Sequence, residues 1–322
     1  MADRALQMRW LMWALVIVLI AVLARSLGTV HAASPSYCAA YFHPDGDGLL
    51  LTLFPVTGPE VNVPLPPGMP RSSGVIFGPD GKAIYVALGY VGLTNPEPFR
   101  KVEFGPLRQS VVPGTDGFMS IWHFTVSKPS GDIFISGILP KRGGCGTFEV
   151  DPSTGAVKTL RVGAYPGCGG GGGVVSPDGT RILDYVNDGL QVVNLETGVA
   201  QAIHGIKRGQ KEGNWGSAVT WSPNGQWVSA VLSDGKILLI DSSDMSRQRR
   251  LGPSHSGFVI WSPDSKYLLL QKSQLRCLSF DSSFDSLEIL EVETGRRTIV
   301  KSSRCNVGPA GGVGWLDPSV VR

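Results

Sequence analysis

Apolar runs of a few residues, broken by tight polar turns, recur through most of the chain. A clear copy is VTWSPNGQWVSAVL at residues 219–232, where apolar and alternating residues flank Pro223, Asn224 and Gly225. Proline fixes φ, and Asn-Gly supplies the positive φ angles that a tight hairpin needs. The copy therefore predicts two paired antiparallel strands joined by a short turn.

Copies of this pattern return along the chain at a regular spacing. Four more cover residues 75–88, 124–138, 174–186 and 259–271, and a shorter one, residues 313–321, closes the chain. The turn prolines of all six are separated by 40 to 55 residues and lie at positions 79, 129, 177, 223, 263 and 318. That spacing is the blade period of a β-propeller.

A second hairpin signal follows each copy. Thr-Gly turns mark four of these hairpins, at residues 57–58, 154–155, 197–198 and 294–295, and weaker versions occupy residues 99–112 and 236–251. Two hairpins per repeat give four strands, which is the content of one propeller blade.

The count of hairpins predicts how the ring closes. The second kind of hairpin begins at residue 50, whereas the first kind ends the chain, so the first blade should be composite. Residues 311–322 are expected to pair with strands in about residues 36–65, which removes two open sheet edges. The predicted fold is all-β: one six-bladed β-propeller over residues 36–322, preceded by an N-terminal hydrophobic helix.

The repeats resemble the blades of the TolB-like (WD-like) β-propeller family, whose signature is Trp-Ser-Pro-Asp-Gly, two further residues and an apolar residue. The resemblance covers nearly all of residues 36–322. It is strong at residues 219–232 and 259–271 and good at residues 75–88 and 174–186. It is weak at residues 121–138 and 313–321. It implies the fold without specifying a function, because such propellers serve as scaffolds, ligand binders and accessory domains of enzymes.

The first 33 residues follow a different pattern. Two arginines precede an unbroken apolar run over residues 10–24, and small residues follow at Ala32 and Ala33. This order predicts a secretory signal peptide, and the alternative is an uncleaved N-terminal membrane anchor. Either reading places the remaining chain outside the cytoplasm, in the periplasm or secreted, with membrane contact only through residues 10–24.

Composition and charge exclude several classes of protein. With 42 Gly and 23 Pro the chain is too rich in turns for a helical bundle, and with 42% hydrophobic residues it is too apolar for disorder. A formal net charge of +3 and the lack of a long Lys/Arg run argue against nucleic acid as a partner.

The five cysteines gain meaning from the predicted export. In an oxidising compartment Cys145 could pair with Cys168, and Cys277 with Cys305, each closing a loop, while Cys38 is left over. The connectivity and the role of Cys38 stay open. No Cys-x-x-Cys is present and the histidines are scattered, so neither a metal nor a cofactor is expected.

The repeat also accounts for residues that could suggest chemistry. The glycine-rich stretch at residues 167–179 runs into strand, turn and strand with no helix after it, so it is not predicted to bind phosphate. Aspartates of the repeated turns are predicted to form turns, and tryptophans before the turn prolines are predicted to pack between blades: Asp80, Asp178, Asp264, Trp221, Trp261 and Trp315.

A binding face is predicted from the longer connections. The loops that join the second strand to the third, and one blade to the next, share one face of a propeller and carry basic residues with aromatics between them. The candidate ligand- or partner-binding residues are Tyr90, Lys141, Arg142, Tyr165, Lys207, Arg208, Trp215, Arg276 and Arg304. The alternative is a solvated surface that keeps the domain soluble.

The leading hypothesis is an extracytoplasmic, monomeric binding or scaffold domain that recognises a protein or an anionic cell-envelope ligand and catalyses no reaction. One alternative is a lyase or hydrolase acting in the central channel, and another is an accessory subunit of a membrane complex. The chain has neither a Gly-x-Ser-x-Gly nor a His-Glu-x-x-His motif, and no catalytic residue is assigned.

The exported protein is predicted to hold four of its five cysteines in two disulfides. Alkylation of free thiols followed by mass measurement should therefore label one cysteine before reduction and all five afterwards. Protein made in a reducing cytosol is the control, and it should take five labels without reduction. Five labels on the exported protein before reduction would contradict both pairs.

Overall fold

A computed structural model describes residues 37–321 of the chain apart from several internal segments. Those segments are residues 46–47, 56–58, 66–72, 89–97, 119, 128–129, 141–143, 163–172, 187–188, 208–218, 233–234, 254–258, 273–285 and 303–312. The signal peptide or anchor predicted at residues 1–33, with its hydrophobic helix, lies outside the described residues. Among the described residues, no helix is both long enough and apolar enough to cross a membrane.

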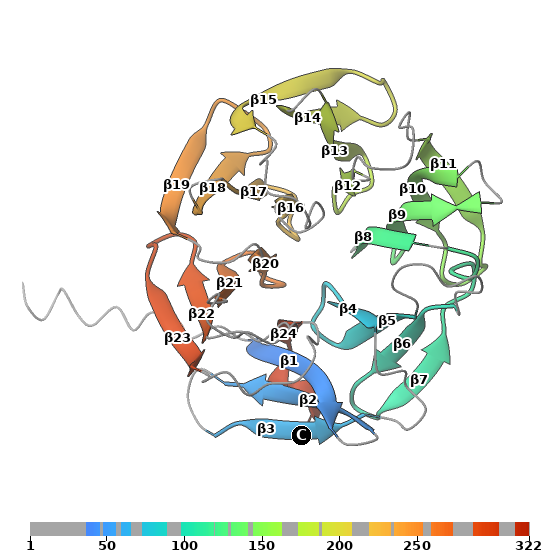
Figure 1. Cartoon of the computed structure of the whole chain (residues 1–322), viewed down its shortest axis with the longest axis vertical. Coiled ribbons are helices and arrows are strands. Elements are labelled where there is room, and N and C mark those ends of the chain that lie inside the picture. Colours follow the sequence, from blue (N-terminus) through green and yellow to red (C-terminus); the bar gives the residue numbers. More distant parts are fainter. Residues whose placement is uncertain are drawn as a thin grey trace, which may run out of the picture. The chain divides into compact units, whose positions relative to one another are not determined.

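The described strands form six four-stranded antiparallel sheets arranged as the blades of a propeller (Figure 1). From the innermost strand outward, blade 1 contains β24 (Val313–Leu316), β1 (Cys38–Asp45), β2 (Gly48–Phe54) and β3 (Val61–Pro64). Blade 2 contains β4 (Ser73–Phe77), β5 (Ala83–Leu88), β6 (Arg100–Glu103) and β7 (Arg108–Val111). Blade 3 contains β8 (Ser120–Val126), β9 (Ile133–Leu139), β10 (Gly144–Val150) and β11 (Val157–Val162).

In the same order, blade 4 contains β12 (Val174–Val175), β13 (Arg181–Val186), β14 (Gly189–Asn194) and β15 (Ala200–Lys207). Blade 5 contains β16 (Val219–Trp221), β17 (Trp227–Val231), β18 (Lys236–Asp241) and β19 (Gln248–Pro253). Blade 6 contains β20 (Val259–Trp261), β21 (Tyr267–Lys272), β22 (Ser286–Glu291) and β23 (Arg297–Ser302). The six-bladed prediction is thus confirmed. A short 3₁₀ helix, η3 (Pro318–Val321), follows β24.

The core is divided among the interfaces between blades. The described buried apolar side chains form six clusters, and each cluster joins one blade to the next. Strand β18 shows how the sequence achieves this: Leu238 and Ile240 pack toward blade 4, whereas Ile237 and Leu239 pack toward blade 6. Successive side chains of a strand point to opposite faces, so a strand buried on both faces is apolar throughout.

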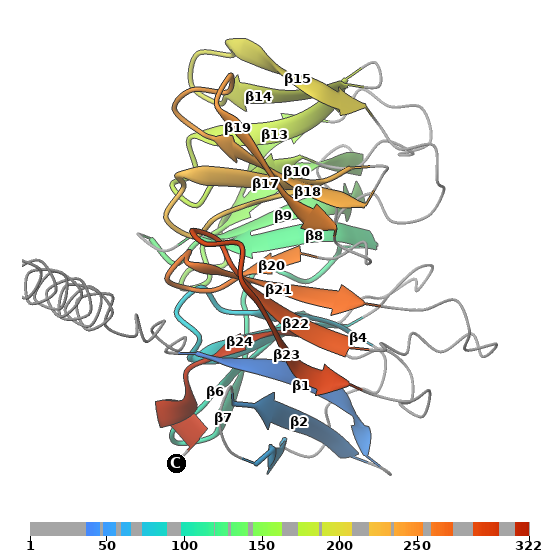
Figure 2. The same ribbon diagram turned by 90° about the vertical axis from the view of Figure 1, so that its left-hand side faces the viewer.

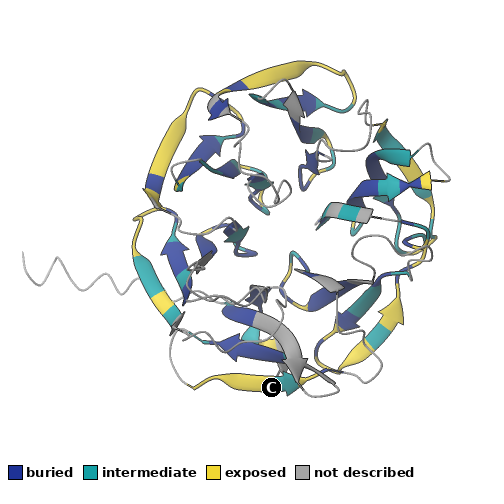
Figure 3. Cartoon of the chain, in the orientation of Figure 1, coloured by how far each residue is buried: buried dark blue, intermediate teal, exposed yellow. Residues whose placement is uncertain are grey.

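Burial falls from the inner strands to the outer ones (Figure 3). The inner and middle strands are mostly buried, and the fourth strand of each blade carries exposed residues. Several of the exposed large apolar side chains belong to these outer strands: Val61, Val111, Val162 and Ile299. The fourth strand therefore completes each sheet but contributes least to the core.

Blade 1 is composite, as predicted. Strand β24 pairs with β1 in antiparallel register, with Ala39 opposite Trp315 and Ala40 opposite Gly314. The ring is thus closed by backbone hydrogen bonds between the two ends of the described chain. Gly314 packs against the Phe77 ring so closely that a Cβ atom at this position would overlap the ring atoms.

Three tryptophans at equivalent positions of the innermost strands form hydrogen bonds to the neighbouring blade. The indole Nε1 of Trp221 donates to the Val174 carbonyl at 2.8 Å, and that of Trp315 donates to the Ile260 carbonyl at 3.0 Å. The third, Trp261, donates to the Ser229 hydroxyl at 3.0 Å. All three side chains are buried, which confirms the prediction that they pack between blades.

The connections between strands divide between two faces of the propeller. The turn face carries the connections from first to second and from third to fourth strand, such as residues 78–82 and 104–107 in blade 2. The loop face carries the connections from second to third strand and from blade to blade, such as residues 89–99 and 112–119. Figure 2 shows the strands running between these faces, with the short turns gathered on its left side.

The contact between Gly314 and Phe77 predicts a measurable coupling. We expect Gly314→Ala to lower the free energy of unfolding by about 1–3 kcal/mol, because the added methyl group overlaps the half-buried Phe77 ring. Urea denaturation should show a smaller loss when the same change is made in a Phe77→Leu background, since the flat ring is then absent. Equal losses of unfolding free energy in both backgrounds would show that overlap with the Phe77 ring is not the cause of the destabilisation.

Candidate functional site

The predicted binding residues lie almost entirely outside the described residues. This applies to Tyr90, Lys141, Arg142, Tyr165, Arg208, Trp215, Arg276 and Arg304. Lys207 ends strand β15, and only its backbone is described. The nine residues therefore stay predictions, although the strand ends on either side of them do lie on the loop face.

The cysteines are described in part. Cys145 lies in β10 and is disulfide-bonded. Cys168, Cys277 and Cys305 lie outside the described residues, so the pairing of Cys145 with Cys168 stays a prediction. Cys38 is buried among the apolar side chains between blades 1 and 2. Its role in the described structure is to fill that interface.

The end of the glycine-rich stretch has a packing role. Gly173 directly precedes strand β12, and a Cβ atom there would overlap the Ile182 side chain and the Leu183 carbonyl oxygen. The Gly173 carbonyl in turn accepts a hydrogen bond of 2.6 Å from Ser136 of blade 3. A small residue is therefore required where this connection enters the innermost strand.

The Ser-Pro-Asp-Gly turns use their polar side chains within the turn. In blade 4 the Ser176 hydroxyl donates to Asp178 at 2.5 Å and accepts from the Arg181 backbone N–H at 2.9 Å. Burial raises the pKa of Asp178, but the hydrogen bonds from Ser176 and Thr180 outweigh burial and lower the pKa overall. The carboxylate is thus held ionised as part of the turn.

Two other blades repeat this arrangement. Ser222 donates to Asn224 at 2.7 Å and accepts from the Trp227 N–H at 2.9 Å. Ser262 does the same with Asp264 and with the Tyr267 N–H. The prediction that the repeated acidic residues form turns is confirmed for Asp178 and Asp264.

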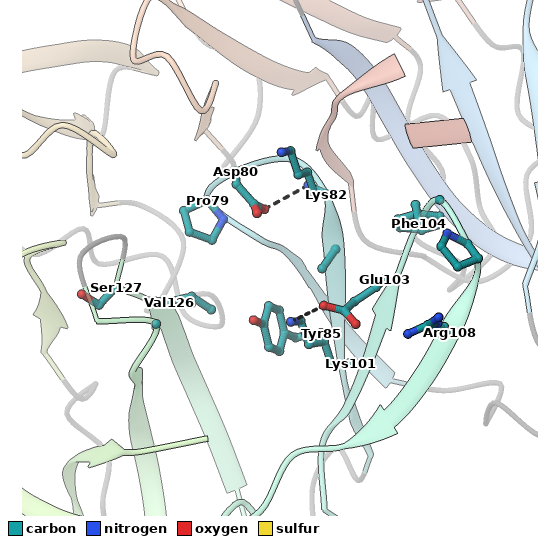
Figure 4. A pocket seen from close by; sticks show the side chains of 14 residues that line it. Pro79, Asp80, Lys82, Tyr85, Lys101, Glu103, Phe104, Arg108, Val126 and Ser127 are labelled. Carbon is teal, nitrogen blue, oxygen red and sulfur yellow. Dashed lines mark hydrogen bonds and ion pairs between the residues drawn. The ribbon is translucent and has the colours of Figure 1, made fainter. Parts of the chain in front are cut away.

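Blade 2 departs from the pattern. Gly78 stands where these three blades have serine, and Asp80 accepts a hydrogen bond of 3.0 Å from the Lys82 backbone N–H. No serine hydroxyl donates a hydrogen bond to the Asp80 carboxylate, which points into a pocket beside blade 3 (Figure 4). Asp80 forms a turn as predicted, but it also lines a cavity.

The pocket has a volume of about 530 Å³ and lies on the turn face between blades 2 and 3. Its walls come from the two turns of blade 2, from strands β5 and β6, and from the first turn of blade 3. The lining residues used below are Pro79, Asp80, Lys82, Tyr85, Lys101, Glu103, Phe104, Pro106, Arg108 and Val126.

Strand register brings the polar groups of the pocket together. Tyr85 of β5 lies directly opposite Lys101 of β6, and Glu103 follows two residues later on the same side of the strand. The Lys101 ammonium lies 2.6 Å from the Glu103 carboxylate. Figure 4 shows this ion pair beside the Tyr85 ring.

The protonation states of these groups follow from their surroundings. Burial raises the pKa of the Tyr85 hydroxyl, and the charge of Lys101 opposes this effect without cancelling it. Burial lowers the pKa of Lys101, but the hydrogen bond to Glu103 and the nearby negative charges outweigh burial and raise the pKa overall. At neutral pH the pocket therefore holds a neutral phenol and an ammonium group, neither of which can act as a general base.

Metal ligands are sparse in the part of the chain that the structure describes. No three side chains of His, Cys, Asp or Glu there are grouped so that they could hold a metal ion.

The pocket residues were not singled out in the sequence, apart from Pro79 and Asp80 as turn residues of the repeat. One signal was available, because the copy at residues 75–88 has glycine before its turn proline, where the copies at residues 174–186, 219–232 and 259–271 have serine. The two charged pocket residues of β6, Lys101 and Glu103, belong to no sequence motif, because such residues are ordinary on the third strand of a blade.

Comparison with known proteins supports the fold. No protein-family model and no curated protein sequence matches the chain. Among solved structures, a chain from Agrobacterium tumefaciens assigned as TolB is 16% identical with a TM-score of 0.52, covering 85% of this chain and 91% of its own. A chain of the nidogen/laminin complex is 9% identical with a TM-score of 0.58, covering 87% and 99%. At these identities the likeness establishes a β-propeller and nothing about its function.

The serine of the repeated turn should matter for stability. We expect Ser222→Ala to lower the free energy of unfolding by about 1–3 kcal/mol, because the half-buried Trp227 N–H loses the hydroxyl acceptor that the buried Ser222 provides. Ser153→Ala is the matched control: its hydroxyl also donates to a polar side chain of its turn, Asp151, but Ser153 is exposed, so the loss should stay within about 0.5 kcal/mol. Equal losses in urea denaturation would contradict a special role for the buried serine.

Proposed function

We propose that this propeller is an extracytoplasmic binding protein that recognises a protein or an anionic cell-envelope ligand on its loop face and does not catalyse a reaction. The observation that carries the proposal is the difference in length between the connections of the two faces. Turn-face connections are short, whereas several loop-face connections are long enough to shape a binding surface.

The short connections leave little to bind with. Residues 176–180, 222–226 and 262–266 join first to second strands, and in each turn the serine before the proline is hydrogen-bonded to the aspartate or asparagine after it. The third-to-fourth turns behave alike: Asp151 accepts from Ser153 and Thr154. Such turns hold the strands together and offer few free groups to a partner.

The long connections have the opposite character. They join strand ends on the loop face and comprise residues 89–99, 163–173, 208–218, 273–285 and 303–312. Eight of the nine candidate binding residues fall in these stretches or in residues 140–143 between β9 and β10. Long loops on a rigid scaffold are where proteins most often place binding specificity. Basic side chains there would attract an acidic partner.

Two further observations support the proposal. The disulfide bond at Cys145 suits a chain that folds in an oxidising compartment. A propeller chain of this fold is also found in the nidogen/laminin complex, which is an example of the fold within a protein assembly.

Photo-crosslinking in cells tests the proposal. Crosslinking residues placed at Tyr90, Arg142 and Arg276 are expected to capture the same partner, because all three belong to the predicted loop face. Thr197, which is exposed in the turn between β14 and β15 on the other face, is the control position. Recovery of nothing above this control would overturn the proposal.

A further inference from the structure

The pocket between blades 2 and 3 lies on the turn face, away from the loop face, and it is the place where the repeated turn leaves an acid available. In the turns of blades 4 and 6 a serine hydroxyl donates a hydrogen bond to the aspartate. In blade 2, Gly78 removes that hydroxyl, and a Cβ atom at residue 78 would already lie 3.2 Å from Asp80 Oδ1. The Asp80 carboxylate can therefore accept hydrogen bonds from a bound molecule.

The pocket also holds cations that the protein does not neutralise. Lys101 is paired with Glu103. Among the described residues, neither Lys82 nor Arg108 makes an ion pair, and both are exposed. An arginine with a free guanidinium at the edge of a pocket is well suited to a carboxylate, because its donors match the two oxygens in a bidentate fork.

The charges are separated across the pocket. Figure 4 shows Asp80 and Arg108 on opposite sides of the Lys101–Glu103 ion pair. Apolar rings and side chains complete the walls: Pro79, Phe104, Pro106 and Val126. A cavity of about 530 Å³ lies within the range of small-molecule sites.

This arrangement discriminates between classes of ligand. A purely anionic molecule would meet the Asp80 and Glu103 carboxylates, and a purely cationic one would meet the three basic side chains. A molecule with one charge of each sign satisfies both ends of the pocket, and its short carbon chain can lie against the apolar walls. Leaving either charge unpaired would lose the interaction at that end.

We propose that this pocket binds a small zwitterion of the size of a free amino acid or a dipeptide. Its ammonium group lies on Asp80 and its carboxylate on Arg108. The inference goes beyond the proposed function, since it concerns a different face of the propeller and a different class of ligand.

Calorimetric titration of the purified full-length protein tests the inference. The probe is L-alanyl-L-alanine, and the matched probes are its N-acetylated form, which lacks the ammonium group, and its C-terminal amide, which lacks the carboxylate. The dipeptide is expected to bind at least tenfold more tightly than either blocked form. Maltose is a neutral, hydroxyl-rich probe that should not bind. Equal binding of the blocked forms, or binding of maltose alone, would overturn the assignment.

Substitutions locate the site. Asp80→Asn and Arg108→Gln should each weaken dipeptide binding at least tenfold, whereas Asp116→Asn and Arg250→Gln, at exposed positions away from the pocket, should leave it unchanged. Asp80→Asn should have no effect on the N-acetylated form, and Arg108→Gln none on the amide, because the group that each side chain contacts is already missing. Asparagine keeps the acceptor for the Lys82 N–H, and Arg108 is exposed, so both variants should fold.

The two proposals can fail separately. Asp80→Asn and Arg108→Gln should leave crosslinking from Tyr90, Arg142 and Arg276 unchanged. Loss of the crosslinks in these variants would overturn the assignment of two independent sites, whereas absence of crosslinks in the unmodified protein would leave dipeptide binding as a separate result.

Discussion

Burial of both faces of every blade is the constraint on which the structure depends. A four-stranded sheet with apolar residues on each side cannot exist alone in water, so each blade is stable only between two neighbours. In β18, adjacent residues such as Leu238 and Leu239 serve different interfaces, and this is why the strand shows no alternation of apolar and polar positions. Closing the ring through β24 and β1 gives the first and last blades the neighbours that an open array would lack.

The interfaces are not alike, and the differences follow from residue size. Between blades 3 and 4 the described apolar cluster is small, and Gly179 of blade 4 packs closely against the Phe134 ring of blade 3. Polar contacts take a larger share there: Ser136 donates to the Gly173 carbonyl, and Arg161 lies 2.6 Å from the buried Asp184 carboxylate. Apolar packing tolerates small displacements, whereas buried hydrogen bonds and ion pairs do not. The interface between blades 3 and 4 therefore depends more on specific polar contacts than on buried apolar area.

The fold could be predicted in detail because its determinants are local. Pro-Asp-Gly and Thr-Gly turns fix where strands end, and their spacing gives the blade number and the composite first blade. The pocket could not be predicted, because it depends on the register that sets Tyr85 opposite Lys101 and on a turn from the next blade. The loop-face residues stay predictions for a related reason. A repeat fixes where a connection begins and ends, but not which side chains it brings together.

The pairing of β24 with β1 has a consequence for the timing of folding. The residues that complete the first blade, Val313–Leu316, are synthesised after the other described strands, whereas their partners in β1 are synthesised before them. No intermediate length of chain can close the ring, so early blades must wait with one apolar face uncovered. Ring closure is therefore a late step of folding, because it requires Val313–Leu316 and β1 to be present together.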